Sequence, residues 1–194
     1  MLVIGLTGSI AMGKSEAARI LAAYGLPVFD SDAEVHKLYN SEQGAKLIAP
    51  FVPEATHKNK VNREIVTKAV LADGKLLSKL EKVVHAEIRS RRKDFIAAAT
   101  ATGAKAVVVD IPLLFETGSQ KEVDKTIVLS ASAATQRTRA LARPNMTVER
   151  FKMILARQMP DGEKRKLADA VIENDSTIEE LQAKLVAQMQ KWEI

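Results

Sequence analysis

Apolar residues follow two different spacings along the chain, and each spacing predicts one kind of element. Short, nearly continuous apolar runs are typical of buried strands, and they fall at residues 2–6, 27–29, 106–109, 125–129 and 170–172. Apolar residues three and four positions apart are typical of amphipathic helices, and they fall at residues 13–24, 31–39, 58–100 (with a break at 73–74), 135–141, 148–158 and 178–191. Strands that alternate with helices favour an α/β fold in which helices cover both faces of a parallel sheet.

The helix predicted at residues 31–39 has a recognisable start. Ser31 and Glu34 have the spacing of a capping box, in which the first side chain and the fourth satisfy each other's backbone N–H groups. We therefore expect Ser31 to begin this helix.

Composition excludes several classes of chemistry. The 194 residues include no cysteine, so disulfides, thiol nucleophiles and cysteine-ligated metals are excluded. The 5 Phe, 2 Tyr and 1 Trp are too few to favour a base-stacking platform for single-stranded nucleic acid. The N-terminus lacks the pattern of a secretory signal, and no apolar run approaches the ~20 residues needed to cross a bilayer. We expect a soluble, cytoplasmic protein that uses no membrane partner.

The net charge of +5 is unevenly distributed along the chain. Residues 58–93 carry a local charge of +7 and residues 137–166 carry +6, so the rest of the chain is acidic at −8. Two separate basic segments suit small polyanions at least as well as a long nucleic-acid duplex. Solvated helix faces explain the same charges equally well.

One motif identifies a phosphate-binding loop, the P-loop. It is the pattern G-x-x-x-x-G-K-[ST], formed here by Gly8, Ser9, Ile10, Ala11, Met12, Gly13, Lys14 and Ser15. A buried strand precedes the motif and an amphipathic helix follows it, as this loop requires. Its backbone N–H groups surround phosphate oxygens, Lys14 bridges the outer phosphates, and the Ser15 hydroxyl ligates Mg²⁺. The sequence therefore predicts a site for a nucleoside triphosphate with magnesium.

Carboxylates that follow two of the predicted strands suggest a kinase. The guanine-binding pattern of GTPases is absent, because residues 59–62 lack its acid and residues 110–113 lack the glycine of the second motif. Asp30 and Asp32 end the second strand. If that strand lies beside the strand before the P-loop, one carboxylate can face Mg²⁺-bound water, and the other can orient an acceptor hydroxyl and take its proton. The alternative is that Asp32 serves only as the N-cap of a helix that begins at Ala33. Asp110 ends the third strand and can meet Mg²⁺ through water; an ordinary turn residue is the alternative.

Arginines gather in the second basic segment. Arg139 and Arg143 are four residues apart, which places them on one face of a helix, and Arg150 and Arg157 are seven apart on the next helix. Such a set can close over ATP as a lid and neutralise charge on the transferring phosphoryl group. For any single arginine, a solvated surface position is the alternative. The three histidines have no metal-ligand spacing.

Further segments resemble the dephospho-coenzyme A kinase family over nearly the whole chain. They are Ile4-Gly5-Leu6-Thr7-Gly8, Asp30-Ser31-Asp32, Leu80-Glu81 with His85, Asp110-Ile111-Pro112-Leu113-Leu114-Phe115-Glu116, Gln136, Arg139, Arg143, Gln158-Met159-Pro160, Lys164, Ala168-Asp169 and Ile172-x-Asn174. The resemblance implies that ATP, with Mg²⁺, phosphorylates the ribose 3′-hydroxyl of dephospho-CoA. It also implies that Asp32 acts on that hydroxyl, that Arg139 and Arg143 belong to the lid, and that Asn174 joins the nucleotide-binding residues.

The resemblance also implies how one kinase domain is divided. Residues 1–31, 95–138 and 167–194 form a P-loop core with a five-stranded parallel sheet. Residues 32–94 form a helical acceptor-binding insertion, and residues 139–166 form the lid. We expect a monomer or a weak homo-oligomer without a nucleic-acid partner. Another small-molecule kinase, such as one acting on nucleoside monophosphates, and a nucleotide-binding protein without small-molecule turnover remain the alternatives.

Some residues depart from the family pattern. Ser9 and Ala11 stand where glycines are common, which requires that their backbones avoid positive φ. Glu16 replaces a second hydroxyl after the lysine and leaves Ser15 as the magnesium ligand. Ala86 replaces the proline that usually follows His85, and Ile154 stands where a lid arginine is often found, which makes Arg157 a candidate replacement.

Overall fold

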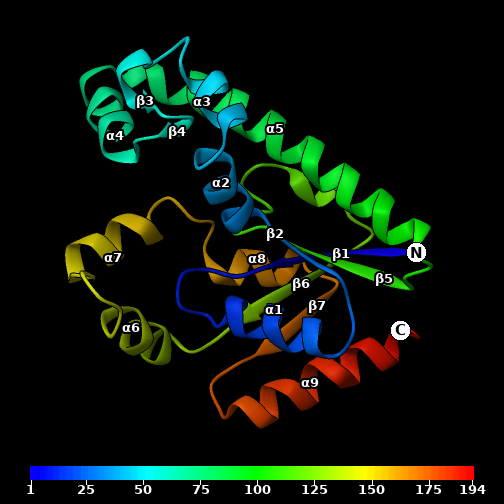
Figure 1. The fold of residues 1–194 in the computed structure, drawn as a ribbon. Coiled ribbons are helices and arrows are strands. Elements are labelled where there is room, and N and C mark those ends of the chain that lie inside the picture. The colour runs from blue at the N-terminus through cyan, green and yellow to red at the C-terminus, as the bar shows by residue number, and fades with distance from the viewer. The chain divides into compact units, whose positions relative to one another are not determined.

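The computed structural model describes all residues from 1 to 194 and divides into two compact units (Figure 1). The first unit comprises Met1–Phe29 and Ala98–Ile194, and the second comprises Asp30–Ala97. The first unit is built on a five-stranded sheet with the order β2-β5-β1-β6-β7. Its strands are β1 (Leu2–Thr7), β2 (Val28–Asp30), β5 (Ala106–Asp110), β6 (Lys125–Ser130) and β7 (Ala170–Glu173). The α/β fold with a parallel sheet, predicted from the alternating pattern, is confirmed.

The central strands are apolar almost throughout because both of their faces are covered. Residues 106–110 of β5 are all buried, and so are residues 126–130 of β6. In the register, Leu6 of β1 lies beside Asp110 of β5, and Thr7 of β1 lies beside Val128 of β6. The carboxyl ends of these strands therefore open at one edge of the sheet, where ligands of parallel α/β folds bind.

Two helices of the first unit pack together against the sheet. They are α1 (Lys14–Ala23) and α9 (Ile178–Lys191), which lie side by side in Figure 1. Leu21 of α1 and Leu181, Leu185 and Met189 of α9 are almost fully buried in one core with strand residues such as Ile4. This core fixes the start of α1 and with it the loop between β1 and α1.

Three short helices complete the first unit after β6. They are α6 (Ala133–Leu141), α7 (Val148–Leu155) and α8 (Asp161–Leu167). The first two helices have side-chain N-caps. Ser132 Oγ accepts a hydrogen bond from the N–H of Thr135 at the start of α6, and Thr147 Oγ1 accepts one from the N–H of Arg150 at the start of α7. Helices α6 and α7 contact each other, and α8 contacts β6.

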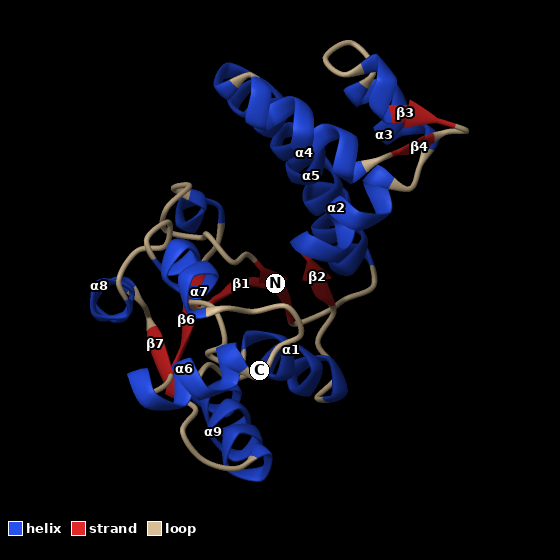
Figure 2. Ribbon diagram, turned by 90° about the vertical axis from the view of Figure 1, so that its left-hand side faces the viewer, coloured by secondary structure: helices blue, strands red, loops and turns tan.

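The second unit is mainly helical. It contains α2 (Ser31–Tyr39), α3 (Glu42–Ile48), α4 (Arg63–Ala72) and most of α5 (Gly74–Ala101). The strands β3 (Thr56–His57) and β4 (Lys60–Val61) form a small antiparallel hairpin, seen beside α3 in Figure 2. Lys58 and Asn59 form its two-residue turn with φ values of 46° and 61°, the left-handed backbone that such a turn needs.

The structure corrects three of the predicted boundaries. Asp30, not Ser31, caps helix α2, because its Oδ1 accepts from the N–H of Ala33 at 2.9 Å. The helix predicted at 148–158 ends at Leu155, and the pattern from residue 58 includes the hairpin before α4 begins. Helix α5 runs unbroken through His85 and Ala86, because alanine leaves intact the backbone bonds that proline would remove.

No helix combines the length and the apolar character that crossing a membrane requires.

Candidate functional site: a phosphate cradle

The loop between β1 and α1 forms a cradle of backbone N–H groups. Ala11 and Gly13 have left-handed backbones, with φ of 64° and 95°, and Gly13 is the residue before α1. No side chain caps the start of α1. The N–H groups of Ala11, Gly13, Lys14 and Ser15 donate to no acceptor within the protein. Open N–H groups at a helix N-terminus bind anions, and the helix dipole adds positive potential there.

Both glycines of the motif are required by space, and Gly13 is required by its backbone conformation as well. A Cβ atom at Gly8 would lie 2.8 Å from the carbonyl oxygen of Leu129 on β6. A Cβ atom at Gly13 would lie 2.0 Å from Nδ2 of Asn174. The loop therefore lies against β6 and against the residue that follows β7, and any side chain at these positions would push it away.

Ala11 contradicts one expectation. The prediction that the residues replacing glycine avoid positive φ holds for Ser9 but is wrong for Ala11. A left-handed backbone costs a residue with a Cβ atom about 1 kcal/mol. The Ala11 methyl group is buried in a small cluster with Ala140 of α6 and Phe151 of α7, which offsets part of that cost.

Lys14 and Asp110 form an ion pair inside the cradle. Lys14 Nζ lies 2.5 Å from Asp110 Oδ1, and the carboxylate side chain is only 3% exposed. Lys14 is the first residue of α1, and Asp110 is the last residue of β5, so the sheet register brings them together. A partner charge is what makes a buried carboxylate tolerable at this position.

The oxygen atoms near the cradle suit a Mg²⁺ ion shared with a nucleotide better than a metal ion bound by protein ligands alone. Ser15 presents its hydroxyl on the exposed first turn of α1, and Asp110 supplies a carboxylate. No group of three His, Cys, Asp or Glu residues could hold a metal ion. Mg²⁺ is typically bound by one or two protein oxygens together with phosphates and water, so this donor set suits the ion in company with a nucleotide.

Glu16, which stands beside Ser15 on α1, is paired with a neighbouring cation. Its carboxylate accepts hydrogen bonds from the Arg19 guanidinium three residues later, at distances down to 2.5 Å. This contact holds the pKa of the Glu16 carboxyl below its usual value. The negative charge that this residue adds next to the phosphate site is therefore balanced locally.

The side chains of Asn174 and Arg139 are linked to the cradle by hydrogen bonds to backbone carbonyl oxygens. Asn174 Nδ2 donates to the carbonyl oxygen of Met12 at 3.0 Å, and Arg139 Nη1 donates to the carbonyl oxygen of Asn174 at 2.7 Å. Arg143 does not share a helix face with Arg139, because α6 ends at Leu141. Arg157 likewise lies beyond the end of α7, so the predicted arginine faces are wrong for both pairs.

Asp30 and Asp32 belong to the second unit. Asp30 is the N-cap of α2, so Asp32 does not cap this helix and its alternative role is excluded. Asp32 occupies the second position of α2 and is exposed. Its carboxylate is free of hydrogen bonds within the second unit.

The structure also shows contacts near the loop that the residue patterns did not predict. Gln136 and Gln158 both hydrogen-bond to Ile10, and Glu116 contacts Lys164, whose side chain is fully buried. Amide side chains follow no spacing rule, so only their places in the family resemblance could have drawn attention to them.

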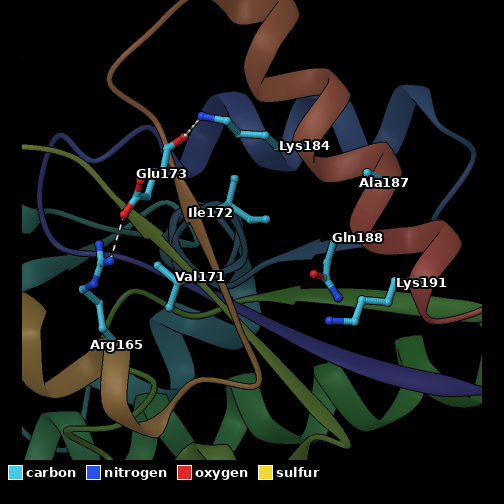
Figure 3. A pocket seen from close by; sticks show the side chains of 8 residues that line it. All are labelled: Arg165, Val171, Ile172, Glu173, Lys184, Ala187, Gln188 and Lys191. Atoms are coloured by element: carbon cyan, nitrogen blue, oxygen red, sulfur yellow. Dashed lines mark hydrogen bonds and ion pairs between the residues drawn. The ribbon is translucent and has the colours of Figure 1, made fainter.

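A separate hollow of about 440 Å³ lies between β7 and α9 (Figure 3). In it Arg165 Nη2 donates to the Glu173 carboxylate, and Lys184 Nζ donates to the backbone oxygen of Glu173, both at 2.8 Å. The charged side chains of Arg165 and Lys184 therefore already have partners within the protein. No residue of the phosphate-binding loop lines this hollow, so we place the candidate site at the cradle.

Comparisons with known proteins identify the family of this chain. The sequence model of the family described as Dephospho-CoA kinase matches residues 2–180. The dephospho-CoA kinase of Rhodopseudomonas palustris (strain HaA2) is 45% identical over 185 residues, covering 95% of this chain and 92% of the relative. That of Brucella melitensis biotype 1 is 47% identical with the same coverage. The solved dephospho-CoA kinase of Campylobacter jejuni is 27% identical, covers 98% of this chain and 96% of its own, and superposes with a TM-score of 0.73. The chain therefore belongs to the dephospho-CoA kinase family, a family of phosphotransferases.

Proposed function

We propose that this protein transfers the γ-phosphoryl group of ATP to the ribose 3′-hydroxyl of dephospho-CoA, which gives coenzyme A and ADP. The observation that carries the proposal is the open cradle of N–H groups with Lys14 beside it, in a chain that belongs to this family. The reaction completes coenzyme A synthesis. We also propose that the protein acts in the cytoplasm, where ATP is available. We further propose that it is a monomer or a weak homo-oligomer.

In this proposal the cradle and Lys14 hold the phosphates of ATP. The N–H groups of residues 11 and 13–15 bind the phosphate oxygens, and Lys14 leaves Asp110 to bridge the β- and γ-phosphates. Ser15 and Asp110 would hold Mg²⁺, which neutralises phosphate charge when it is bound. Gly8, Ser9, Ile10 and Met12 complete the backbone of the nucleotide-binding loop, and Asn174 supports that loop through its bond to Met12.

The acceptor is activated by Asp32 and the transferring group is stabilised by arginine. Asp32 orients the 3′-hydroxyl and accepts its proton while the phosphoryl group moves to the oxygen. Arg139 and Arg143 neutralise the charge that develops on the phosphoryl oxygens. The proposal assigns residues 32–94 to acceptor binding and residues 139–166 to the lid, with the remainder as the nucleotide-binding core.

The test is turnover of ATP with a panel of acceptors: dephospho-CoA, nucleoside monophosphates and shikimate. We expect 3′-phosphorylated product from dephospho-CoA alone, and loss of turnover by at least ~10²-fold in Lys14→Ala. Lys105→Ala, which changes an exposed lysine at the amino end of β5, serves as the matched control. Product from another acceptor, with none from dephospho-CoA, would show a different small-molecule kinase. Salt-dependent duplex binding without any turnover would show a nucleotide-binding protein of another class.

A further inference from the structure

Two glutamine side chains hold both backbone polar groups of Ile10 in the phosphate-binding loop. Gln158 Oε1 accepts from the N–H of Ile10 at 2.9 Å, and Gln136 Nε2 donates to the carbonyl oxygen of Ile10 at 2.9 Å. The chemistry of the backbone fixes both amide orientations, because an N–H needs an acceptor and a carbonyl needs a donor. Gln136 must donate and Gln158 must accept.

The bond from Gln136 sets the direction of the next N–H group. The carbonyl of Ile10 and the N–H of Ala11 belong to one planar trans peptide, so they point in opposite directions. When Gln136 holds the carbonyl on the side of α6, the N–H of Ala11 is turned to the other side. Ala11 has φ of 64°, and its N–H is among those left without an acceptor in the cradle. Gln136 therefore orients a phosphate-binding group that it does not touch.

Both glutamines come from the helical segment between β6 and β7, which also carries Arg139 and Arg143. Gln136 lies on α6, and Gln158 lies three residues after the end of α7. The same helices contribute Ala140 and Phe151, which pack on the Ala11 methyl group. Polar and apolar contacts thus join the loop to α6 and α7 at adjacent residues.

Gln158 is itself held in place by a buried network. The N–H of the next residue, Met159, donates to Glu116 Oε1 at 2.8 Å. The same carboxylate oxygen lies 2.9 Å from Nζ of Lys164, whose side chain is fully buried. Glu116 follows β5, so the sheet fixes the place from which Gln158 reaches the loop.

We infer that Gln136 and Gln158 are positioning residues that shape the cradle for ATP, so that displacement of α6 and α7 weakens the phosphate-binding site. This inference rests on the proposed role of the loop as the ATP site. It predicts that loss of either bond weakens ATP binding and raises KM for ATP. Neither glutamine belongs to residues 32–94, which the proposed function assigns to acceptor binding, so we expect KM for dephospho-CoA to stay unchanged.

A matched pair of glutamate variants tests the direction of each bond. Gln158→Glu keeps an acceptor for the Ile10 N–H, whereas Gln136→Glu replaces the donor with a carboxylate that faces a carbonyl oxygen. Both variants add the same charge near the same loop. We expect the Kd of Mg·ATP to rise about tenfold or more in Gln136→Glu and much less in Gln158→Glu. Equal weakening in both would overturn the inference, because charge alone would then explain it.

Gln136→Met and Gln158→Met remove each bond without adding charge. We expect each to raise the Kd of Mg·ATP, measured by calorimetry, by about three- to tenfold. An unchanged Kd in both methionine variants would overturn the inference, whatever their melting temperatures.

Binding is measured without an acceptor, so the result is independent of turnover. If the wild type binds ATP but does not phosphorylate dephospho-CoA, the proposed acceptor is wrong while these variants still decide the role of the glutamines.

Discussion

At the scale of single residues, Gly13 combines two separate constraints. Its φ of 95° disfavours any side chain, and a Cβ atom there would collide with the amide of Asn174. The Asn174 amide in turn donates to Met12 one residue earlier. The glycine thus allows the residue after β7 to support the loop at close range.

Comparison of Gly13→Ala with the double variant Gly13→Ala/Asn174→Ala should distinguish the cost of the backbone conformation from the cost of the collision with Asn174. We expect Gly13→Ala alone to weaken Mg·ATP binding strongly and to destabilise the protein by more than about 1 kcal/mol, the backbone cost alone. In the double variant the collision is gone, so stability measured by urea unfolding should partly recover relative to the sum of the single changes. Strict additivity would show that the collision does not matter.

Asp32 offers a test of catalysis at a second residue. Asp32→Asn keeps the size of the side chain but removes the base, so we expect kcat to fall by about 10²–10⁴-fold while the Kd of ATP changes little. Asp124→Asn is a suitable control, because Asp124 precedes β6 at the amino end of the sheet, and its bond from the N–H of Val3 is one that an asparagine oxygen can also accept. A kcat of Asp32→Asn close to that of the control would remove Asp32 from the mechanism.

The P-loop could be predicted residue by residue, but its internal contacts could not. The motif gave the identity of the loop because its spacing encodes a backbone shape. The left-handed backbone of Ala11 was not predictable, since alanine there depends on the buried contact with Phe151 from a distant helix. The roles of Gln136 and Gln158 depend in the same way on tertiary contacts that no local spacing records.

At the scale of elements, helix α8 is held by charged side chains at its buried face. Lys164 is fully buried, and its ammonium lies 2.9 Å from Glu116 but forms no well-directed hydrogen bond. Asp161, the first residue of α8, accepts a hydrogen bond from the Ser130 hydroxyl at 2.6 Å. These contacts attach the segment after Gln158 to β6 and to the loop after β5.

Glu116→Gln, Lys164→Met and the double variant measure this attachment. Each single change leaves a buried charge without its partner, so we expect each to lower the free energy of unfolding by about 3 kcal/mol. The double variant removes both charges and should cost less than the sum of the two. Urea unfolding gives all three values, and exact additivity would mean that the two side chains do not interact.

Asp169, just before β7, gives a pH-dependent link between two strands. Its Oδ2 accepts from the N–H and the hydroxyl of Thr126, both at 2.8 Å. Partial burial raises the pKa of the Asp169 carboxyl, but hydrogen bonds from Thr126 and the Lys125 ammonium outweigh it, so the folded-state pKa lies below the usual value. The resulting stabilisation is complete above the unfolded-state pKa of about 3.9 and is lost as the pH falls through the folded-state pKa.

Asp169→Asn should therefore cost stability at neutral pH and little in acid. We expect a loss of about 1 kcal/mol at pH 7, because the hydrogen bonds to a charged acceptor are weakened. The difference from wild type should shrink as the pH is lowered below about 4. Urea unfolding at several pH values provides the measurement, and a difference that stays constant down to pH 2 would rule out the ionised carboxylate as its source.

Elements were predictable where they were long or strongly apolar. The five strands and the helices α1 and α9 followed from apolar spacing. Helices α3 and α8 have only 7 residues each, too few for a clear period, and were missed. The hairpin of β3 and β4 was missed because its turn residues, Lys58 and Asn59, are not the Asn-Gly or Asp-Gly pair that marks such turns.

At the scale of the whole molecule, the sheet order determines which predicted residues meet. The alternating pattern predicted a parallel sheet, but not that β1 would lie between β5 and β6. The arrangement considered for Asp30 and Asp32, with β2 directly beside β1, is wrong, because β5 lies between these two strands. This order places Asp110 next to the cradle and lets Leu129 and Asn174 support the loop from the other side. Strand order depends on contacts far apart in the chain, so it was beyond the reach of local patterns.

The hollow beside β7 also bears on solubility. This strand is an edge of the sheet, and an open edge invites another chain to add a strand and start aggregation. Asn174 donates its N–H to β6, so the carbonyl of Glu173 in the same peptide faces outward, where the Lys184 ammonium covers it. With Arg165 beside it, the short edge presents charge to an approaching strand. The chain thus protects its C-terminal sheet edge from intermolecular pairing with a side chain of its last helix.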